Sequence, residues 1–277
     1  MEEQVPESSQ IATELGEQDA NRLLLQYLLL HRGSCDEGQL LKALKTLEVK
    51  DLNATEWQNR LNKWMASVNL TLNALDYKVS RLRNRSGGWS YVYVDLAPAE
   101  DTKGATRLNL DELNFVQWAI QRFLGDRSAI QARGSKSSVE NAVDGILREK
   151  FGSSEFESLQ LRLYHTSGST ELCQYEEMDA LKVEYLLARL CQLRWFYETA
   201  EGRFGLDVRA LAELQTYIRE KYSVPDCSVC SELALEGIQC KCNENAWHVA
   251  CLRHFLAHVG TSCPSCGSSL EQAVYMT

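Results

Sequence analysis

Seven of the ten cysteines lie between Cys227 and Cys266, near the C-terminal end of the sequence. With one histidine they form four pairs of potential metal ligands: Cys227 and Cys230, Cys240 and Cys242, His248 and Cys251, Cys263 and Cys266. Two ligands this close in sequence can grip one tetrahedral Zn²⁺ from a tight turn, so four pairs predict two zinc sites. Protein side chains fill all eight positions and leave none open for water, which is typical of structural rather than hydrolytic zinc.

The other cysteines and histidines do not fit this pattern. A redox or disulfide cluster is the alternative for the paired thiols, and the absence of a secretory signal argues against it. His254 and His258 are rival ligands, four residues apart on a predicted helix, but they lie outside the pair spacing and are expected at the surface. Cys35, Cys173 and Cys191 are scattered, and we predict that they are small apolar residues.

The composition excludes several classes of protein. The chain has 277 residues, a length typical of about two domains, and 44% of them are apolar, which is enough for a buried core. The net charge of −9 argues against a broad basic surface for nucleic acid. The longest apolar stretch, residues 23–30, is far shorter than the about 20 residues of a membrane-spanning helix. We therefore predict a soluble intracellular protein with no membrane partner.

Acidic charge is concentrated at the N-terminal end. Six acids and no base precede Arg22, whereas residues 22–224 carry 27 acids and 27 bases. A polar, acidic segment with few aromatic residues predicts a disordered tail, which we place at 1–18. A solvated leader with no specific role is the favoured interpretation.

Residues 19–97 predict three helices followed by a hairpin. The first helix covers 20–33, with Gly33 at its end, and a shorter one follows. The third begins after a cap at Asn53 or Thr55. Its apolar side chains recur with the rhythm of one helical face: Trp57, Leu61, Trp64, Met65, Val68 and Leu72. The period then changes to two around the turn RNRSGG, and three helices with a hairpin are the order of a winged-helix domain.

A polar stretch predicts a linker over 98–107, and the order of elements recurs more loosely over 108–224. The helices are DELNFVQWAIQRFLG, SSVENAVDGILREKFG and a third with apolar side chains on one face: Met178, Leu181, Tyr185, Leu186 and Leu190. RWFYETAEGRFGLD predicts the second hairpin, and a long helix runs from there toward Pro225. We assign no element to the insertion at about 152–174.

The order of four cysteines, one histidine and three cysteines occurs in PHD fingers and in RING variants. A PHD finger usually has an aromatic residue two positions before the seventh ligand, where this chain has Thr261. The sequence resembles a RING instead, with Phe255 four residues after the sixth ligand and Pro264 directly after the seventh. In RING ubiquitin ligases these two positions and that of Val229 form the groove for a ubiquitin-conjugating enzyme. The resemblance also implies interleaved sites: Cys227, Cys230, His248 and Cys251 would hold one zinc, and Cys240, Cys242, Cys263 and Cys266 the other.

A wider resemblance joins this region to the rest of the chain. The helix RALAELQTYIREKY runs directly into the PDCSVC knuckle, and HVAC and CPSC follow. With the NRLLLQYLLLHRG helix, the YVYVDL strand and the WFYETAEGRF hairpin, the layout is similar to the element 1 subunits of the non-structural-maintenance-of-chromosomes group, over about residues 20–266. That family implies two winged helices with a variant RING, membership of the SMC five–six complex, and DNA repair by homologous recombination on chromosomes in the nucleus. It also implies two partners, a MAGE-type third element and a kleisin fourth element.

The same resemblance implies RING-type ubiquitin ligase activity. Such a subunit orients a ubiquitin-conjugating enzyme and supplies no catalytic residue of its own. Active RING ligases often carry an arginine after the eighth ligand, where this chain has Gly267, so we expect weak activity without the MAGE-type partner. A non-catalytic, zinc-stapled scaffold is the alternative.

A third hypothesis is contact with DNA, through the first hairpin and within the complex. Four basic residues lie there, and no acidic residue lies between Tyr77 and Val94. These four residues can contact phosphates: Lys78, Arg81, Arg83 and Arg85. The predicted third helix holds Glu56 beside Arg60 and Lys63, which is no basic recognition face. A solvated hairpin, or one that meets a partner protein, is favoured over a DNA contact.

The predicted fold class is therefore mainly α with β-hairpin wings. A tandem winged-helix body precedes a C-terminal variant RING zinc domain over 225–269, and a tail covers 270–277. A generic helical domain with two hairpins is the alternative for the body, because its two halves share an order of elements but no detectable residue identity.

Overall fold

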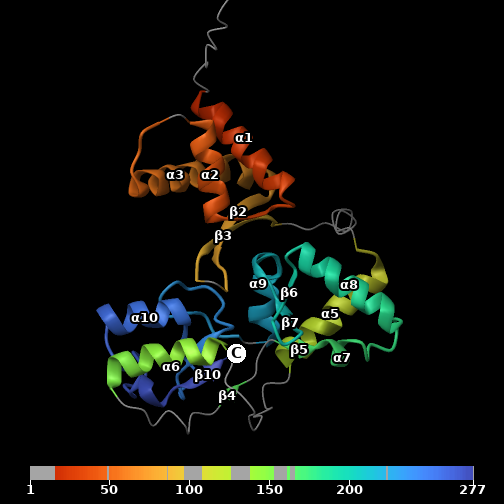
Figure 1. The fold of residues 1–277 in the computed structure, drawn as a ribbon, viewed down its shortest axis with the longest axis vertical. Helices are drawn as coiled ribbons and strands as arrows, with labels where there is room; N and C mark the ends of the chain where they lie inside the picture. Colours follow the sequence, from red (N-terminus) through yellow and green to blue (C-terminus); the bar gives the residue numbers. More distant parts are fainter. Residues whose placement is uncertain are drawn as a thin grey trace, which may run out of the picture.

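Figure 1 shows three bodies in the computed structural model of this chain. The described residues are 16–48, 50–85, 87–96, 108–125, 138–152, 161–162, 166–222 and 224–276. The predicted linker 98–107 and most of the predicted tail 1–18 lie outside them. None of the helices in these ranges has the length and apolar character needed to cross a membrane.

The first helical body is residues 16–96, and the second is 108–125 with 166–222. The cysteine-rich domain is helix α6 (Ser138–Phe151) and strand β4 (Leu161–Arg162) together with 224–276.

The first helical body has the helices and the hairpin that the sequence predicts. Its elements are α1 (Glu17–Leu30), β1 (Ser34–Asp36), α2 (Glu37–Leu47), α3 (Ala54–Leu72), the short 3-10 helix η1 (Asn73–Leu75), β2 (Tyr77–Arg83) and β3 (Trp89–Asp95). Helix α1 begins inside the predicted tail and ends where Arg32 and Gly33 take left-handed conformations. Of the two candidate caps for α3, Asn53 is the one used, because its side chain accepts from the Glu56 N–H and the Glu56 carboxylate accepts from the Asn53 N–H.

The core of this body lies between α3 and the two preceding helices. All the predicted positions on α3 are buried except Met65, which is partly buried. Arg60 donates to the Glu48 carboxylate at 2.8 Å and to the Asn21 side chain at 3.1 Å, so one guanidinium joins α3 to α1 and to the end of α2. Burial opposes ionisation of Glu48, but hydrogen bonds from Arg60 and Lys50 outweigh it and hold the pKa of this carboxyl below its ordinary value.

The second helical body repeats the order of the first. Its elements are α5 (Leu110–Gly125), β5 (Ser167–Gly168), α7 (Ser169–Leu172), α8 (Ala180–Gln192), β6 (Phe196–Glu198), β7 (Arg203–Leu206) and α9 (Val208–Tyr222). The strand order is β5-β7-β6 here and β1-β3-β2 in the first body, so the last strand of each hairpin lies in the middle. Three helices followed by a hairpin are the order on which the winged-helix prediction rests, and each body adds a short strand between the first two helices. The assignment to that fold stays a prediction.

Helix α8 faces the core differently from the prediction. Its buried residues are Val183, Leu186, Leu187 and Leu190. The predicted face included Leu181 and Tyr185, but these side chains are 75% and 70% exposed. Apolar residues cover so much of this helix that two overlapping faces fit the helical period, and packing decides between them.

The helix predicted as the second of the repeat packs on the cysteine-rich domain instead. Helix α6 lies beside α10 (Val249–His258), and Val143, Ile146 and Leu147 are buried in one cluster with residues of that domain. Strand β4, from the segment without an assigned element, pairs in parallel with β10 (Val274–Met276). The domain predicted over 108–224 therefore contains a segment that completes another core, which helical periodicity cannot reveal.

The cysteine-rich domain also includes the residues predicted as a tail. Its sheet has the order β4-β10-β8-β9, with β8 (Gly237–Gln239) and β9 (Ala246–His248) in sequence before α10. A 3-10 helix, η3 (Leu270–Gln272), and β10 occupy the predicted tail. Leu270 and Met276 are 0% exposed, so the chain is folded up to Met276.

The β2–β3 hairpin of the first body reaches down between the other two bodies (Figure 1). Its residues Leu82, Val92 and Val94 are buried against Val208 and Ala212 of α9. The hairpin therefore contributes two strands to its own sheet and also packs against a helix of the second helical body.

Candidate metal centre

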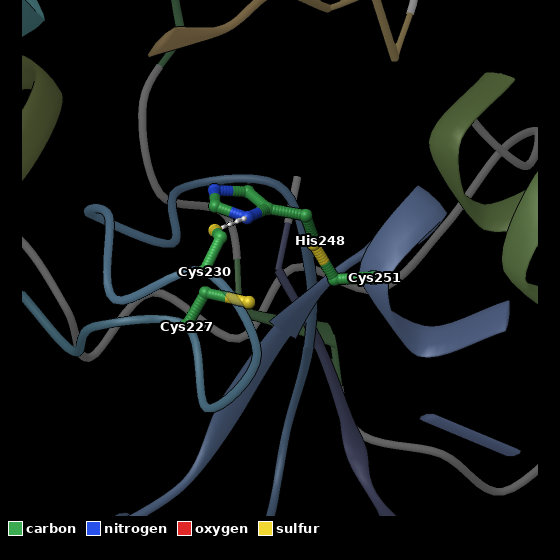
Figure 2. A group of neighbouring side chains, drawn as sticks. All are labelled: Cys227, Cys230, His248 and Cys251. Atoms are coloured by element: carbon green, nitrogen blue, oxygen red, sulfur yellow. Dashed lines mark hydrogen bonds between the residues drawn. The ribbon is translucent and has the colours of Figure 1, made fainter. Parts of the chain in front are cut away.

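The first group of predicted ligands gathers around the start of α10. Figure 2 shows Cys227, Cys230, His248 and Cys251 turned toward one another, and their ligand atoms all lie within 4.8 Å. The Cys230 sulfur is 3.4 Å from His248 Nδ1. The other ring nitrogen, Nε2, is 2.9 Å from the Leu233 carbonyl, which can only accept. Nε2 therefore carries the proton, and Nδ1 is free to bind metal.

The second group joins the loop after β8 to the loop after α10. Cys240, Cys242, Cys263 and Cys266 place their sulfurs within 4.8 Å of one another. The sulfurs of Cys240 and Cys266 are 3.4 Å apart, and those of Cys242 and Cys263 are 3.7 Å apart. The amide of Asn245 donates to the Cys263 sulfur at 3.3 Å, a contact that orients this ligand.

Both groups fit zinc. Around a tetrahedral zinc with Zn–S bonds of about 2.3 Å, neighbouring ligand atoms are about 3.8 Å apart. The separations in both groups lie near that value, and thiolates with one imidazole are donors that structural zinc prefers. The predicted interleaving is confirmed, and the two groups can hold two zinc ions.

The remaining cysteines and histidines lie apart from both groups. His254 and His258 are exposed on α10, with ring centroids 4.7 Å apart, and neither joins a metal group among the described residues. Cys35 is buried in the first helical body, whereas Cys173 and Cys191 are partly buried against the core of the second.

Two of the three predicted groove residues are exposed on neighbouring loops. Val229 is 38% exposed, and Pro264 is exposed. Asn245 joins the loops, because its side-chain oxygen accepts from Ser228 at 2.9 Å and its amide donates to Ser265 at 2.6 Å. The side chain of Asn245 thus hydrogen-bonds both Ser228, the residue before Val229, and Ser265, the residue after Pro264.

Phe255, the third predicted groove residue, lies in the core. It is only 4% exposed, and its ring centroid is 5.2 Å from that of Trp247. Its ring belongs to the buried cluster that includes Cys240 and Cys263, and it offers almost no surface to a partner. A single aromatic residue on a short helix carries no sequence signal that distinguishes a buried ring from an exposed one.

The basic residues of the first hairpin make contacts within the chain. Arg81 donates to Asn62 at 3.0 Å and lies 4.4 Å from the ring centroid of Trp89. Arg83 lies 3.8 Å from the same centroid and donates to the Gly87 carbonyl at 2.6 Å. Lys78 is half-buried on β2.

Arg85 reaches the two other bodies. Its guanidinium pairs with Glu236 at 2.8 Å and lies 3.8 Å from the ring centroid of Tyr197, whose hydroxyl donates to Glu236 at 2.9 Å. The backbone N–H of Arg83 donates to the Glu232 carboxylate at 3.0 Å. These partners are not among the predicted site residues, although the net acidic charge after Pro225 and the basic hairpin are a pair of sequence signals that point to such a contact.

Two regions of the chain match families of known proteins. The family described as the Nse1 non-SMC component of the SMC5-6 complex matches residues 21–214, and a RING-like domain matches residues 227–266. Non-structural maintenance of chromosomes element 1 of Saccharomyces cerevisiae is 32% identical, over 92% of this chain and 94% of the relative. The human homolog of that element is 26% identical, over 90% of this chain and 82% of the relative.

A solved structure has the same fold. A chain of an Nse1-Nse3-Nse4 complex aligns with a TM-score of 0.60 at 19% identity, and the alignment covers 92% of this chain and 96% of that one. The family match extends over most of the chain, and the identity to the yeast relative extends over nearly all of it. The chain therefore belongs to the Nse1 family of non-SMC components of the SMC5-6 complex, and it carries a RING-like domain at its C-terminal end.

Proposed function

We propose that this chain is a RING-type ubiquitin ligase subunit of the SMC5-6 complex, acting in DNA repair by homologous recombination on chromosomes in the nucleus. Family membership and the RING-like domain support the proposal. The observation that carries it is the pair of exposed apolar residues, Val229 and Pro264, on zinc-binding loops that Asn245 holds together. In RING ligases, residues of this kind dock a ubiquitin-conjugating enzyme.

The proposed reaction moves ubiquitin from a conjugating enzyme to a substrate lysine. The lysine amine attacks the carbonyl of the ubiquitin thioester, an isopeptide bond forms, and the carbon–sulfur bond breaks. The thiol of the conjugating enzyme leaves with a proton that the amine loses. This chain provides no nucleophile, and its contribution is to orient the loaded enzyme. Zinc bound by the eight side chains would fix the loops that carry the docking edge.

The partners we propose are a MAGE-type third element and a kleisin fourth element. The structural relative comes from an Nse1-Nse3-Nse4 complex, which supports this assignment. The turn at Gly267 supports dependence on a partner, because Gly267 has a φ of 71° and donates to the Cys263 carbonyl at 2.9 Å. An arginine would be strained in this left-handed conformation, so the turn disfavours the residue that holds donor ubiquitin in active RING ligases.

The experiment is a discharge assay with the full zinc-loaded chain, a ubiquitin-loaded conjugating enzyme and free lysine. Discharge should be slow for the chain alone and about tenfold faster with the MAGE-type subunit, which corresponds to about 1.4 kcal/mol of barrier. Val229→Arg should abolish this gain and leave the zinc content unchanged. Val259→Ala is the control, because Val259 is an exposed apolar residue at the end of α10 that is neither a metal ligand nor a predicted groove residue.

Two outcomes would contradict the proposal in different ways. Full activity of Val229→Arg beside its partner would show that the docking edge is misassigned. An inactive wild-type complex, tested with a panel of conjugating enzymes, would favour the non-catalytic scaffold. Phe255→Ala is unsuitable for this test, since it also removes a ring from the domain core.

A scaffold that helps the complex engage DNA is the second candidate function. The observation that favours it is the basic hairpin itself, whose Lys78 and Arg81 lie away from the contacts made by Arg85. DNA binding by the assembled complex should weaken as salt rises. Replacing Lys78 and Arg81 with alanine should make this salt dependence weaker, so that the slope of log K against log salt becomes less negative by at most about two. Replacing all four basic residues would also disturb the contact between bodies, so the double variant is the clean test.

A further inference from the structure

The outward face of α8 carries large apolar side chains. Leu181 is 75% exposed and Tyr185 is 70% exposed, one helical turn apart. Both line an open hollow of about 460 Å³, together with Met178 and with residues at the start of α5. Isolated exposed apolar residues are ordinary, but a group around a hollow marks a binding surface.

This surface, defined as Met178, Leu181 and Tyr185, shares its hollow with acidic side chains of the same segments. The exposed acids on its two helices and on the turn before α8 are Asp111, Glu176, Glu177, Asp179 and Glu184. Lys182 is the base that lines the hollow. Arg189 lies nearby, but it pairs with Glu112 at 2.6 Å. The rim therefore has a net negative charge.

The position of α8 makes this charge informative. Helix α8 is the third helix in the order that the two helical bodies share. In helix-turn-helix proteins, the corresponding recognition helix lies in the major groove of DNA. Here that face offers an aromatic and a leucine among carboxylates, which repel phosphates and attract basic groups. The surface fits a protein segment and opposes nucleic acid.

We propose that this surface docks a basic segment of one of the two other non-SMC subunits, and that the segment inserts apolar side chains beside Leu181 and Tyr185. The inference rests on the proposed membership of a complex with these subunits. Apolar anchors would supply most of the affinity, with the tyrosine as the principal contact. The acidic rim would set the orientation of the segment and speed its association.

The test uses the full chain in the complex reconstituted with the MAGE-type and kleisin subunits. The affinity of this chain for the two other subunits is measured by isothermal titration calorimetry at low and high salt. Leu181→Ala with Tyr185→Ala should weaken it at least tenfold. Leu70→Ala with Leu75→Ala is the matched control, because these leucines are 81% and 63% exposed on the first helical body, and it should leave affinity unchanged. Asp179→Lys with Glu184→Lys should weaken association and reduce its salt dependence.

Photo-crosslinking from a benzophenone amino acid at position 185 identifies the occupant. A crosslink to a Lys- and Arg-rich segment of either subunit supports the proposal. Crosslinks only to a second copy of this chain or to an acidic segment would overturn it, as would affinities within twofold of wild type in both surface variants. In those cases the wild-type complex still forms, so the proposed function survives. If no wild-type complex forms, the partner assignment and this inference fail together.

Discussion

At the scale of single residues, the surroundings of the sulfur atom separate two kinds of cysteine in this chain. Eight metal-ligand side chains meet in two groups, whereas Cys35 and Cys191 lie alone against apolar cores. Burial raises the pKa of both thiols to about 11, and in Cys191 the charges of Glu198 and Asp207 add to the effect. Because the thiolate is the reactive form, these two thiols are held in the inert form at neutral pH.

We predict that a maleimide leaves Cys35 and Cys191 unmodified in the native, zinc-loaded protein at pH 8. At that pH a thiol with a pKa of about 11 is deprotonated in about one molecule in a thousand. The sign follows from the raised pKa: labelling should increase as pH rises toward 11, not as it falls. Mass spectrometry of peptides reports the modified positions, and labelling in guanidinium serves as the control. Rapid native labelling of Cys35 would contradict its burial.

Ligand identity could be predicted from sequence because ligand pairs are local. Two ligands on one tight turn leave a mark in the spacing of residues, and all eight were found in this way. Predicting which ligand pairs share a metal required the family resemblance, because that assignment depends on the tertiary structure and not on local spacing. The burial of Phe255 and the bridging role of Asn245 depend on neighbours from distant loops, and no spacing encodes them.

At the scale of elements, the cysteine-rich domain is built from two separate parts of the chain. Helix α6 and strand β4 precede the second hairpin in sequence, yet both complete this domain. The sequence predicted the helix from its period but placed it in the wrong body, because an apolar face does not specify the surface that it covers. Strands of two or three residues, such as β4 and β10, are too short to show a period at all.

We predict that deleting residues 270–277 opens the cysteine-rich domain. The deletion removes Leu270 and Met276, both 0% exposed, together with the central strand β10, which pairs with β8 and β4. Loss of two buried side chains should cost at least about 4 kcal/mol of unfolding free energy. Zinc release to a chromogenic chelator should therefore be faster, while the helical bodies keep their thermal transition. Glu271→Ala is the control, since that side chain is exposed. A truncated chain that resists the chelator as wild type does would show that the strand is dispensable.

At the scale of the whole molecule, the first hairpin connects all three bodies. Arg85 meets Glu236 of the cysteine-rich domain and Tyr197 of the second helical body. The Glu232 carboxylate accepts from the Arg83 N–H, and the next residue, Leu233, accepts from the metal-ligand ring of His248. The carboxylates of the short segment 232–236 thus contact the hairpin, and the backbone of the same segment contacts the metal ligand His248. The position of the hairpin should therefore depend on the first metal group being filled.

We predict that Arg85→Ala loosens this junction without loss of zinc. Arg85 is 38% exposed, so its ion pair with Glu236 is worth about 1 kcal/mol or less, and its contact with the Tyr197 ring adds about 1 kcal/mol. Hydrogen exchange at the tip of the hairpin should then be about tenfold faster, provided that it proceeds by local opening. Arg22→Ala is the matched control, because its ion pair with Asp19 is exposed and lies within one helix.

Zinc chelation tests whether the first metal group influences the hairpin, whereas Arg85→Ala tests whether the hairpin contact influences zinc binding. Zinc removal should also speed exchange at the Arg83 amide, because a metal-free His248 no longer holds the backbone of Leu233 and, beside it, Glu232. Arg85→Ala should show the faster exchange with two zinc ions still bound, since no ligand is altered. If chelation frees the metal while the Arg83 amide stays protected as in the native protein, the hairpin is held by α9 alone. The buried contacts of Leu82 and Val92 with that helix would then suffice to position it.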